Sequence, residues 1–229
     1  MSYAGSHKSA TTAVVLLFAT CSWLFVSAAV SADSRALVVR VYDTANGDSL
    51  SRATAIRTAA AILRDAEFFI EWRDCTSAGS QPDCQNPQRG DLIVRIVPTP
   101  PRRTSAAANS LLLRAAPGEE QSQLGVAVLN PVTLTGQLAT VFQQPVVRMA
   151  NRAGIAPAEL LGRTIAHETG HLLLRSRSHS STGLMRETWT LEELTSNRRD
   201  DWRFAPGDRL RLQHQFAINL ASREMTEGE

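Results

Sequence analysis

Lysine is almost absent from this chain: only Lys8 is found among its 229 residues, and every other fixed basic charge is an arginine. Aromatic residues make up 6%, and neither charge sign dominates, because 24 basic residues face 22 acidic ones for a net charge of +2. So small a net charge gives no indication of a nucleic-acid surface. Apolar and charged residues alternate along nearly the whole length, which excludes a disordered polyelectrolyte, a collagen-like chain and a polytopic membrane protein.

Charge is missing from one long segment near the start. After Lys8 the chain is almost continuously apolar from Ala13 to Val30, and Val30-Ser31-Ala32 matches the small-x-small pattern of an export cleavage site. We therefore predict a signal peptide over residues 1–32 and one domain over 33–229, secreted or periplasmic and free of the membrane once cleaved. An uncleaved N-terminal anchor is the alternative, since about 18 apolar residues approach the length that spans a bilayer.

Cysteine is scarce as well, with three in the chain. Two of them, Cys75 and Cys84, follow the predicted leader and enclose a polar stretch. In an exported protein such a pair is expected to form a disulfide that constrains a surface loop. Two free thiols are the alternative interpretation.

Periodicity predicts an α+β domain, with a small mixed β-sheet and a first helix that crosses over it. Strands are expected at residues 36–42, 68–72, 91–97 and 125–129. Helices are expected at residues 49–67, 138–153, 157–174 and 206–222. Between them, the proline-marked residues 99–123 are expected to form a long exposed loop.

Two helices carry finer expectations. In the first, the apolar pattern places five residues on one helical stripe: Leu50, Ala53, Ile56, Ala60 and Leu63. In the second, Pro145 is expected to kink or split the helix.

The helix predicted at 157–174 contains His167-Glu168-Thr-Gly-His171, a His-Glu-x-x-His pattern. Residues four apart on a helix project from one face, about 6 Å from each other. Two imidazoles at that spacing can bind one Zn²⁺, and Glu168 can reach a water beside it. Two buried structural histidines are the alternative.

A catalytic zinc ion needs a third protein ligand and an open position. His179, eight residues beyond His171, is the first candidate. A glutamate further along, Glu187, Glu192 or Glu193, is the alternative, because some zinc peptidases take their third ligand from a later helix.

These residues resemble the metzincin superfamily of zinc peptidases. Its members extend the motif to His-Glu-x-x-His-x-x-Gly-x-x-His and follow it with a turn whose methionine lies beneath the metal. Here Leu174 stands at the family's glycine position and Arg177 at its third histidine, while His179 comes two residues later. Gly183-Leu184-Met185 is similar to the methionine turn. The resemblance implies that His179 is the third ligand and that a C-terminal helix follows the turn.

The resemblance further implies a secreted zinc-dependent metalloendopeptidase that takes peptide or protein substrates and holds one Zn²⁺. Glu168 would be the general base, accepting a proton from a zinc-activated water. In metzincins an edge strand pairs with the substrate, and residues 126–129 would form it here. Some members carry a tyrosine two residues after the turn methionine, where this chain has Glu187.

A second hypothesis belongs to a different class. The missing glycine and tyrosine also suit an exported metal-binding or interaction protein that keeps the scaffold without turnover. Trp189 either lines a substrate pocket or belongs to the core, and His214 is expected to be a half-buried structural residue. No nucleic-acid partner is expected, and the oligomeric state does not follow from the sequence.

Overall fold

A computed structural model describes most of the chain after the predicted leader. The described residues are 37–76, 82–88, 90–101, 110–112 and 123–215. The chain divides into two units, Met1–Asp33 and Ser34–Glu229, and every described residue belongs to the second. The predicted signal peptide therefore lies outside the described residues. None of the described helices is long and apolar enough to cross a membrane.

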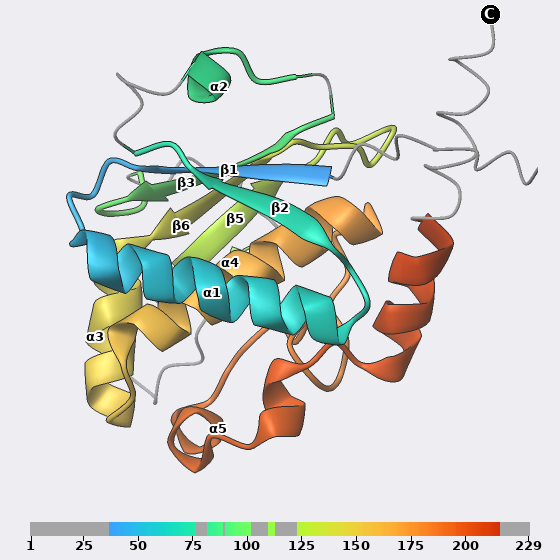
Figure 1. The fold of residues 1–229 in the computed structure, drawn as a ribbon. Helices are drawn as coiled ribbons and strands as arrows, with labels where there is room; N and C mark the ends of the chain where they lie inside the picture. The colour runs from blue at the N-terminus through green and yellow to red at the C-terminus, as the bar shows by residue number, and fades with distance from the viewer. Residues whose placement is uncertain (1–36, 77–81, 89, 102–109, 113–122, 216–229) are drawn as a thin grey trace, which may run out of the picture. The chain divides into compact units, whose positions relative to one another are not determined.

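The described part of this unit contains a six-stranded mixed sheet (Figure 1), with the strands in the order β2-β1-β3-β6-β5-β4. The strands are β1 Leu37–Asp43, β2 Ile70–Asp74, β3 Leu92–Val97, β4 Ser110–Leu112, β5 Gln123–Val128 and β6 Leu138–Phe142. The first four strands of that order run parallel, whereas β5 is antiparallel to both β6 and β4. The predicted α+β class with a small mixed sheet is confirmed.

Helix α1, Ser49–Asp65, makes the predicted crossover between the parallel strands β1 and β2. Asp48 is its N-cap residue, and the Asp48 carboxylate accepts a hydrogen bond from the Ser51 N–H. The buried face of α1 differs from the apolar stripe: Leu50 is 72% exposed, and the buried residues are Arg52, Ala55, Ala59 and Leu63. Arg52 can be buried because its guanidinium pairs with two carboxylates, a contact that apolar periodicity does not reveal.

Residues 138–142 correct the prediction of one helix over 138–153. They form β6, which lies between β3 and β5, and only Gln143–Ala153 is helical as α3. Pro145 falls in the first turn of α3, where its missing N–H breaks no helical hydrogen bond, so it neither kinks nor splits the helix. Pairing with two neighbouring strands outweighs the local helical pattern.

The predicted loop 99–123 is also corrected, because it contains β4, which pairs with β5. The segment expected at the sheet edge is therefore covered along Gln123–Val126, and β4 is the edge strand. By contrast, α4 spans Pro157–Leu174 as predicted. Residues 206–215 are helical, and the remainder of the last predicted helix lies outside the described residues.

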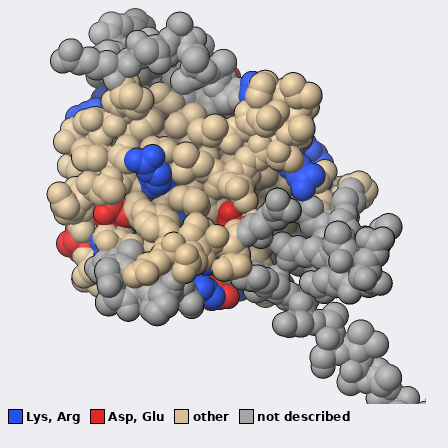
Figure 2. All heavy atoms as spheres, turned by 90° about the horizontal axis from the view of Figure 1, so that it is seen from above, with Lys and Arg blue, Asp and Glu red and all other residues tan. Residues whose placement is uncertain are grey.

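The helices α1, α3 and α4 lie on one face of the sheet, below it in Figure 1, and the main core fills the space between them. The short α2, Pro82–Gln85, lies on the other side. Seen from above, the visible described surface is mostly uncharged, with single basic and acidic side chains scattered over it (Figure 2). The described part of this face therefore has no continuous charged patch.

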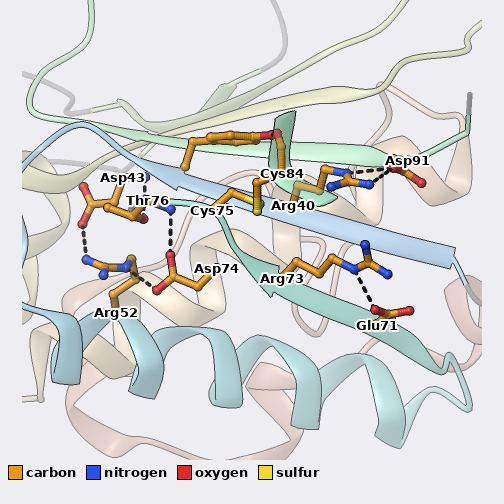
Figure 3. Close-up of a disulfide and its surroundings, with 11 residues drawn as sticks. Arg40, Asp43, Arg52, Glu71, Arg73, Asp74, Cys75, Thr76, Cys84 and Asp91 are labelled. Carbon is orange, nitrogen blue, oxygen red and sulfur yellow. Dashed lines mark hydrogen bonds and ion pairs between the residues drawn. A yellow bond between two sulfur atoms is a disulfide. The ribbon is translucent and has the colours of Figure 1, made fainter. Parts of the chain in front are cut away.

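Cys75 and Cys84 form the predicted disulfide, with their Cα atoms 5.5 Å apart. Figure 3 shows it beside β1, where it joins the end of β2 to α2. The Cys75 N–H donates to the Val41 carbonyl at 2.7 Å, and the Tyr42 hydroxyl donates to the Cys84 carbonyl at 2.9 Å. The disulfide thus holds this loop against β1.

Reduction of this disulfide should lower the free energy of unfolding by about 2–3 kcal/mol, because it releases a short closed loop in the unfolded chain. The measurement is urea unfolding with and without reductant, in a Cys21→Ser background so that no third thiol exchanges. Equal unfolding midpoints under the two conditions would contradict a closed disulfide.

Candidate metal centre

Helix α4 presents the His-Glu-x-x-His motif from inside the protein. It packs against α1, α3 and the sheet, and His167, Glu168 and His171 are each at most 1% exposed. Flanking apolar residues such as Leu160 and Ile165 are fully buried and belong to the main core. The motif is therefore held on a rigid element rather than on a loop.

Three histidine rings come together at this helix. His167, His171 and His179 can each offer a nitrogen atom so that all three atoms lie within 4.8 Å of one another. The Nε2 atoms of His167 and His171 are 3.1 Å apart, and the ring of His179 lies 4.8 Å from that of His171, centroid to centroid. The fold thus gathers all three predicted metal-ligating histidines.

Two backbone carbonyls orient the rings on the helix. The Nδ1–H of His167 donates to the Leu184 carbonyl at 2.8 Å, and that of His171 donates to the Ser176 carbonyl at 2.8 Å. These bonds leave each Nε2 with a free lone pair at the cluster. The Nε2 of His179 is buried without a hydrogen-bond partner among the described residues. Three imidazole nitrogens that lie close together, without other hydrogen-bond partners among the described residues, fit a zinc ion.

Burial lowers the pKa of all three imidazoles. The pKa of His167 falls well below its usual value, that of His171 falls to about 4, and that of His179 falls although the charge of Glu187 opposes it. The neutral ring is the form that binds metal. The three side chains are therefore already in the ligating state at neutral pH.

The helix ends in a way that accounts for the displaced third histidine. Leu174, at the position of the family's glycine, is still helical, and Arg175 adopts the left-handed conformation with φ 47° and ψ 45°. The Ser176 N–H then bonds back to the His171 carbonyl at 3.2 Å. The helix thus breaks one residue after the family's glycine position, and the longer turn carries His179 back to the cluster.

The segment Gly183-Leu184-Met185 lies directly against the motif. The Met185 Sδ atom is 2.7 Å from the point where a Cβ on Gly170 would stand, so the two residues are in close contact. The Leu184 N–H donates to the Arg203 carbonyl at 2.7 Å. The turn therefore ties the ligand helix to the C-terminal part of the chain.

Trp189 belongs to the core rather than to a substrate pocket. It is fully buried, and its ring meets that of His167 edge-on at 5.7 Å and that of Trp202 at 5.3 Å. Its indole N–H donates to the Leu184 carbonyl, the same oxygen that accepts from His167. Trp189 thus packs against the His167 ring and shares its hydrogen-bond acceptor.

Glu168 is fully buried against β5 at Gly125, where a Cβ would stand 2.7 Å from the carboxylate Oε1. Neither carboxylate oxygen makes a hydrogen bond of normal geometry with a described residue. Burial raises the pKa of Glu168 well above its usual value, and the nearby Ala127 N–H opposes this in part. The role of Gly125 was not predicted from the sequence, although a glycine inside a strand is a signal of close approach.

None of the alternative third ligands belongs to the metal-capable group found among the described residues. Glu193 pairs with Arg186 and closes the capping box that begins α5, Leu191–Ser196. Glu192 is exposed, and Glu187 is not part of the metal-capable group found among the described residues. His214 is exposed, so the expectation of a half-buried structural residue was wrong.

Two solved structures are similar to this chain. The crystal structure of archaemetzincin from Methanopyrus kandleri has a TM-score of 0.48 at 14% identity, covering 80% of this chain and 96% of that one. A zinc-dependent peptidase from Methanocorpusculum labreanum has a TM-score of 0.46 at 13% identity, covering 76% and 99%. The chain matches no family model and no curated protein. The described site is metzincin-like. Its three clustered histidines and its methionine turn are the features that it shares with that superfamily.

Gly183→Ala should damage the site. Gly183 has φ 74°, and a Cβ there would stand 2.4 Å from the Arg203 carbonyl oxygen. We expect a loss of about 2 kcal/mol or more of stability and weaker zinc binding, because strain and overpacking add. The measurements are urea unfolding and zinc competition with a chelator.

Gly154→Ala is the matched control, since Gly154 has φ 68° but no atom within 4 Å of the point where its Cβ would stand. It should cost about 1 kcal/mol and leave zinc affinity unchanged. Equal effects of the two substitutions would show that the turn does not hold the site.

Proposed function

We propose that this protein is an exported zinc-dependent endopeptidase. The observation that carries the proposal is that the half-buried His179 meets the buried His167 and His171 beside one face of α4, with Glu168 next to His167 in the chain. Buried structural histidines normally form protein hydrogen bonds through both ring nitrogens. Here, by contrast, the Nε2 of His179 has no partner among the described residues.

His167, His171 and His179 would hold one Zn²⁺ through their ring nitrogens. The chemistry that a bound ion supplies here is Lewis acidity, which polarises a scissile carbonyl and makes a water a better nucleophile. The carbonyls of Leu184 and Ser176 keep two of the rings in the orientation that this requires.

Glu168 moves the proton in this proposal. In its ionised form, which burial alone disfavours by raising the pKa, the Glu168 carboxylate accepts a proton from the attacking water and later delivers it to the nitrogen of the leaving amine. Contact with Gly125 on β5 fixes the side chain, so its position relative to the neighbouring histidines is set before substrate arrives.

The substrate strand would add to the sheet at residues 127–129. In the described part of the chain, β4 pairs with β5 from Gln123 to Val126, and Val128 is 53% exposed. An extended peptide that pairs with backbone groups there would lie along the strand that contacts Glu168. The proposal thus keeps residues 127–129 of the expected substrate strand 126–129, because Val126 already pairs with Ser110.

The second candidate, a metal-binding or interaction protein without turnover, is favoured by two observations. Glu168 is 0% exposed, and Glu187 replaces the tyrosine that some metzincins use to stabilise the oxyanion. The two candidates differ in whether cleavage depends on Glu168.

Glu168→Gln should lower cleavage of casein by at least about 100-fold, because the amide cannot accept the proton. Zinc content should stay near one ion per chain, since Gln keeps the size of the side chain. The assay is casein hydrolysis alongside metal analysis, with Glu192→Gln at an exposed position as a control that keeps full activity. Undiminished cleavage by Glu168→Gln would contradict the role of Glu168, and zinc binding without chelator-sensitive cleavage would favour the second candidate.

Export is part of the proposal and is supported by the Cys75–Cys84 disulfide, because such bonds persist in oxidising compartments. In a bacterial host that exports the protein, its mass and N-terminal sequence should show a chain that begins at Asp33. Ala32→Arg should block this cleavage, since the peptidase needs a small residue there. A membrane-bound chain that keeps residues 1–32 would instead establish the anchor alternative.

A further inference from the structure

Arg177 stands where the metzincin motif has its third histidine, and its side chain contacts the end of β5. The Arg177 Nη2 donates a hydrogen bond to the Leu129 carbonyl at 2.8 Å, although the two residues are 48 positions apart in the sequence. Arg177 is partly buried, and Leu129 is 6% exposed. The side chain therefore links the turn after α4 to the strand that lies against Glu168.

The Leu129 carbonyl faces the edge of β5 along which the proposed substrate strand would lie. The residues on either side of Leu129 face the opposite edge, towards the chain that leads into β6. The Asn130 N–H donates to the Thr135 carbonyl at 2.8 Å. The Val128 carbonyl oxygen lies 2.1 Å from the point where a Cβ on Gly136 would stand. Because the backbone groups of successive strand residues alternate between the two edges, the Leu129 carbonyl points away from β6.

The turn that carries Arg177 also carries His179, two residues later. His179 is followed by Ser180, whose N–H donates to the Met185 carbonyl at 2.8 Å. The Ser180 hydroxyl donates to the Asp208 carboxylate at 2.6 Å, and Asp208 is 3% exposed. His179 thus lies between two anchors, of which Arg177 holds the turn to β5 and Ser180 holds it to the methionine turn and Asp208.

An anchor close to His179 matters because residues 176–190 form neither helix nor strand. Irregular segments lose conformational freedom when a ligand orders them, and a contact formed beforehand reduces that cost. A guanidinium suits this purpose because it keeps its charge, and hydrogen bonds from charged donors are stronger than those between neutral groups.

We propose that Arg177 is a positioning residue that ties the metal centre to the substrate strand. Its hydrogen bond to Leu129 holds His179 ready for zinc and fixes the outer edge of β5 beside that ligand. The inference rests on the proposed zinc peptidase and deepens it, because it gives a role to the residue at which this chain departs from the metzincin motif.

Zinc competition with a chelator, on the purified protein, tests the link to His179. Arg177→Met keeps an unbranched side chain but removes the donor, and should weaken zinc binding about tenfold or more, because partners that orient metal ligands contribute roughly 10–100-fold to affinity. Arg177→Lys keeps a charged donor and should recover most of this loss. Arg148→Met, at an exposed position of α3, is the matched control and should bind zinc as the wild type does. Wild-type zinc affinity in Arg177→Met, or equal losses in the Met and Lys variants, would overturn the proposal.

Hydrogen exchange read by mass spectrometry tests the link to β5 and separates it from a general loss of stability. In the wild type, zinc should slow the exchange of residues 127–135, because ordering the turn orders the strand that Arg177 binds. In Arg177→Met at saturating zinc this slowing should be lost. Equal slowing in both proteins would contradict the link. Should Arg177→Met not fold, the wild type alone still decides, since zinc without effect on residues 127–135 contradicts it too.

Kinetics at saturating zinc add a readout that zinc loss does not explain. Arg177→Met should raise the KM of a peptide substrate more than it lowers kcat, and a fall in kcat alone would contradict the link to the substrate strand. Zinc affinity and hydrogen exchange are measured without cleavage. Failure of the peptidase proposal, seen as no chelator-sensitive hydrolysis by the wild type, is therefore distinguishable from failure of this one. A wild-type protein that binds no zinc would overturn both.

Discussion

The hydrogen bond from His167 to the Leu184 carbonyl is the contact on which the site depends. That oxygen also accepts the Trp189 indole N–H, and the Leu184 N–H is bound to the Arg203 carbonyl. One peptide segment thus connects the ligand helix, the methionine turn and the chain that follows. Because His167, Leu184 and Trp189 are buried, shifting the turn would leave several polar groups unpaired at once.

Close packing around α4 imposes a second constraint, because small residues are needed where the helix carries its chemistry. Gly125 on β5 leaves space for the Glu168 carboxylate, and Gly170 leaves space for Met185. Glu168 is therefore positioned by the sheet from one side, while the histidines are oriented by loop carbonyls from the other. Although α4 lacks the glycine of the metzincin motif, the left-handed conformation of Arg175 ends the helix. The turn that follows then brings His179 to the cluster.

Local sequence patterns were enough to predict α4, the Cys75–Cys84 disulfide and the clustering of the three histidines. Each of these depends on residue spacing along one helix or loop. The errors arose where distant pairing decides the outcome. Leu138–Phe142 has a helical pattern but becomes β6 between two strands, and β4 covers a strand expected at the edge. Arg52 rather than Leu50 lies on the buried face of α1, because carboxylates from two other segments neutralise it.

The central claim is that His167, His171 and His179 hold one zinc ion. A crystal structure of the zinc-loaded protein, with anomalous scattering measured on both sides of the zinc edge, tests it most directly. The account predicts a single strong anomalous peak about 2.0–2.1 Å from one nitrogen of each of the three rings. A peak ligated by Glu187, Glu192 or Glu193 in place of His179, or no peak at the three histidines, would contradict it.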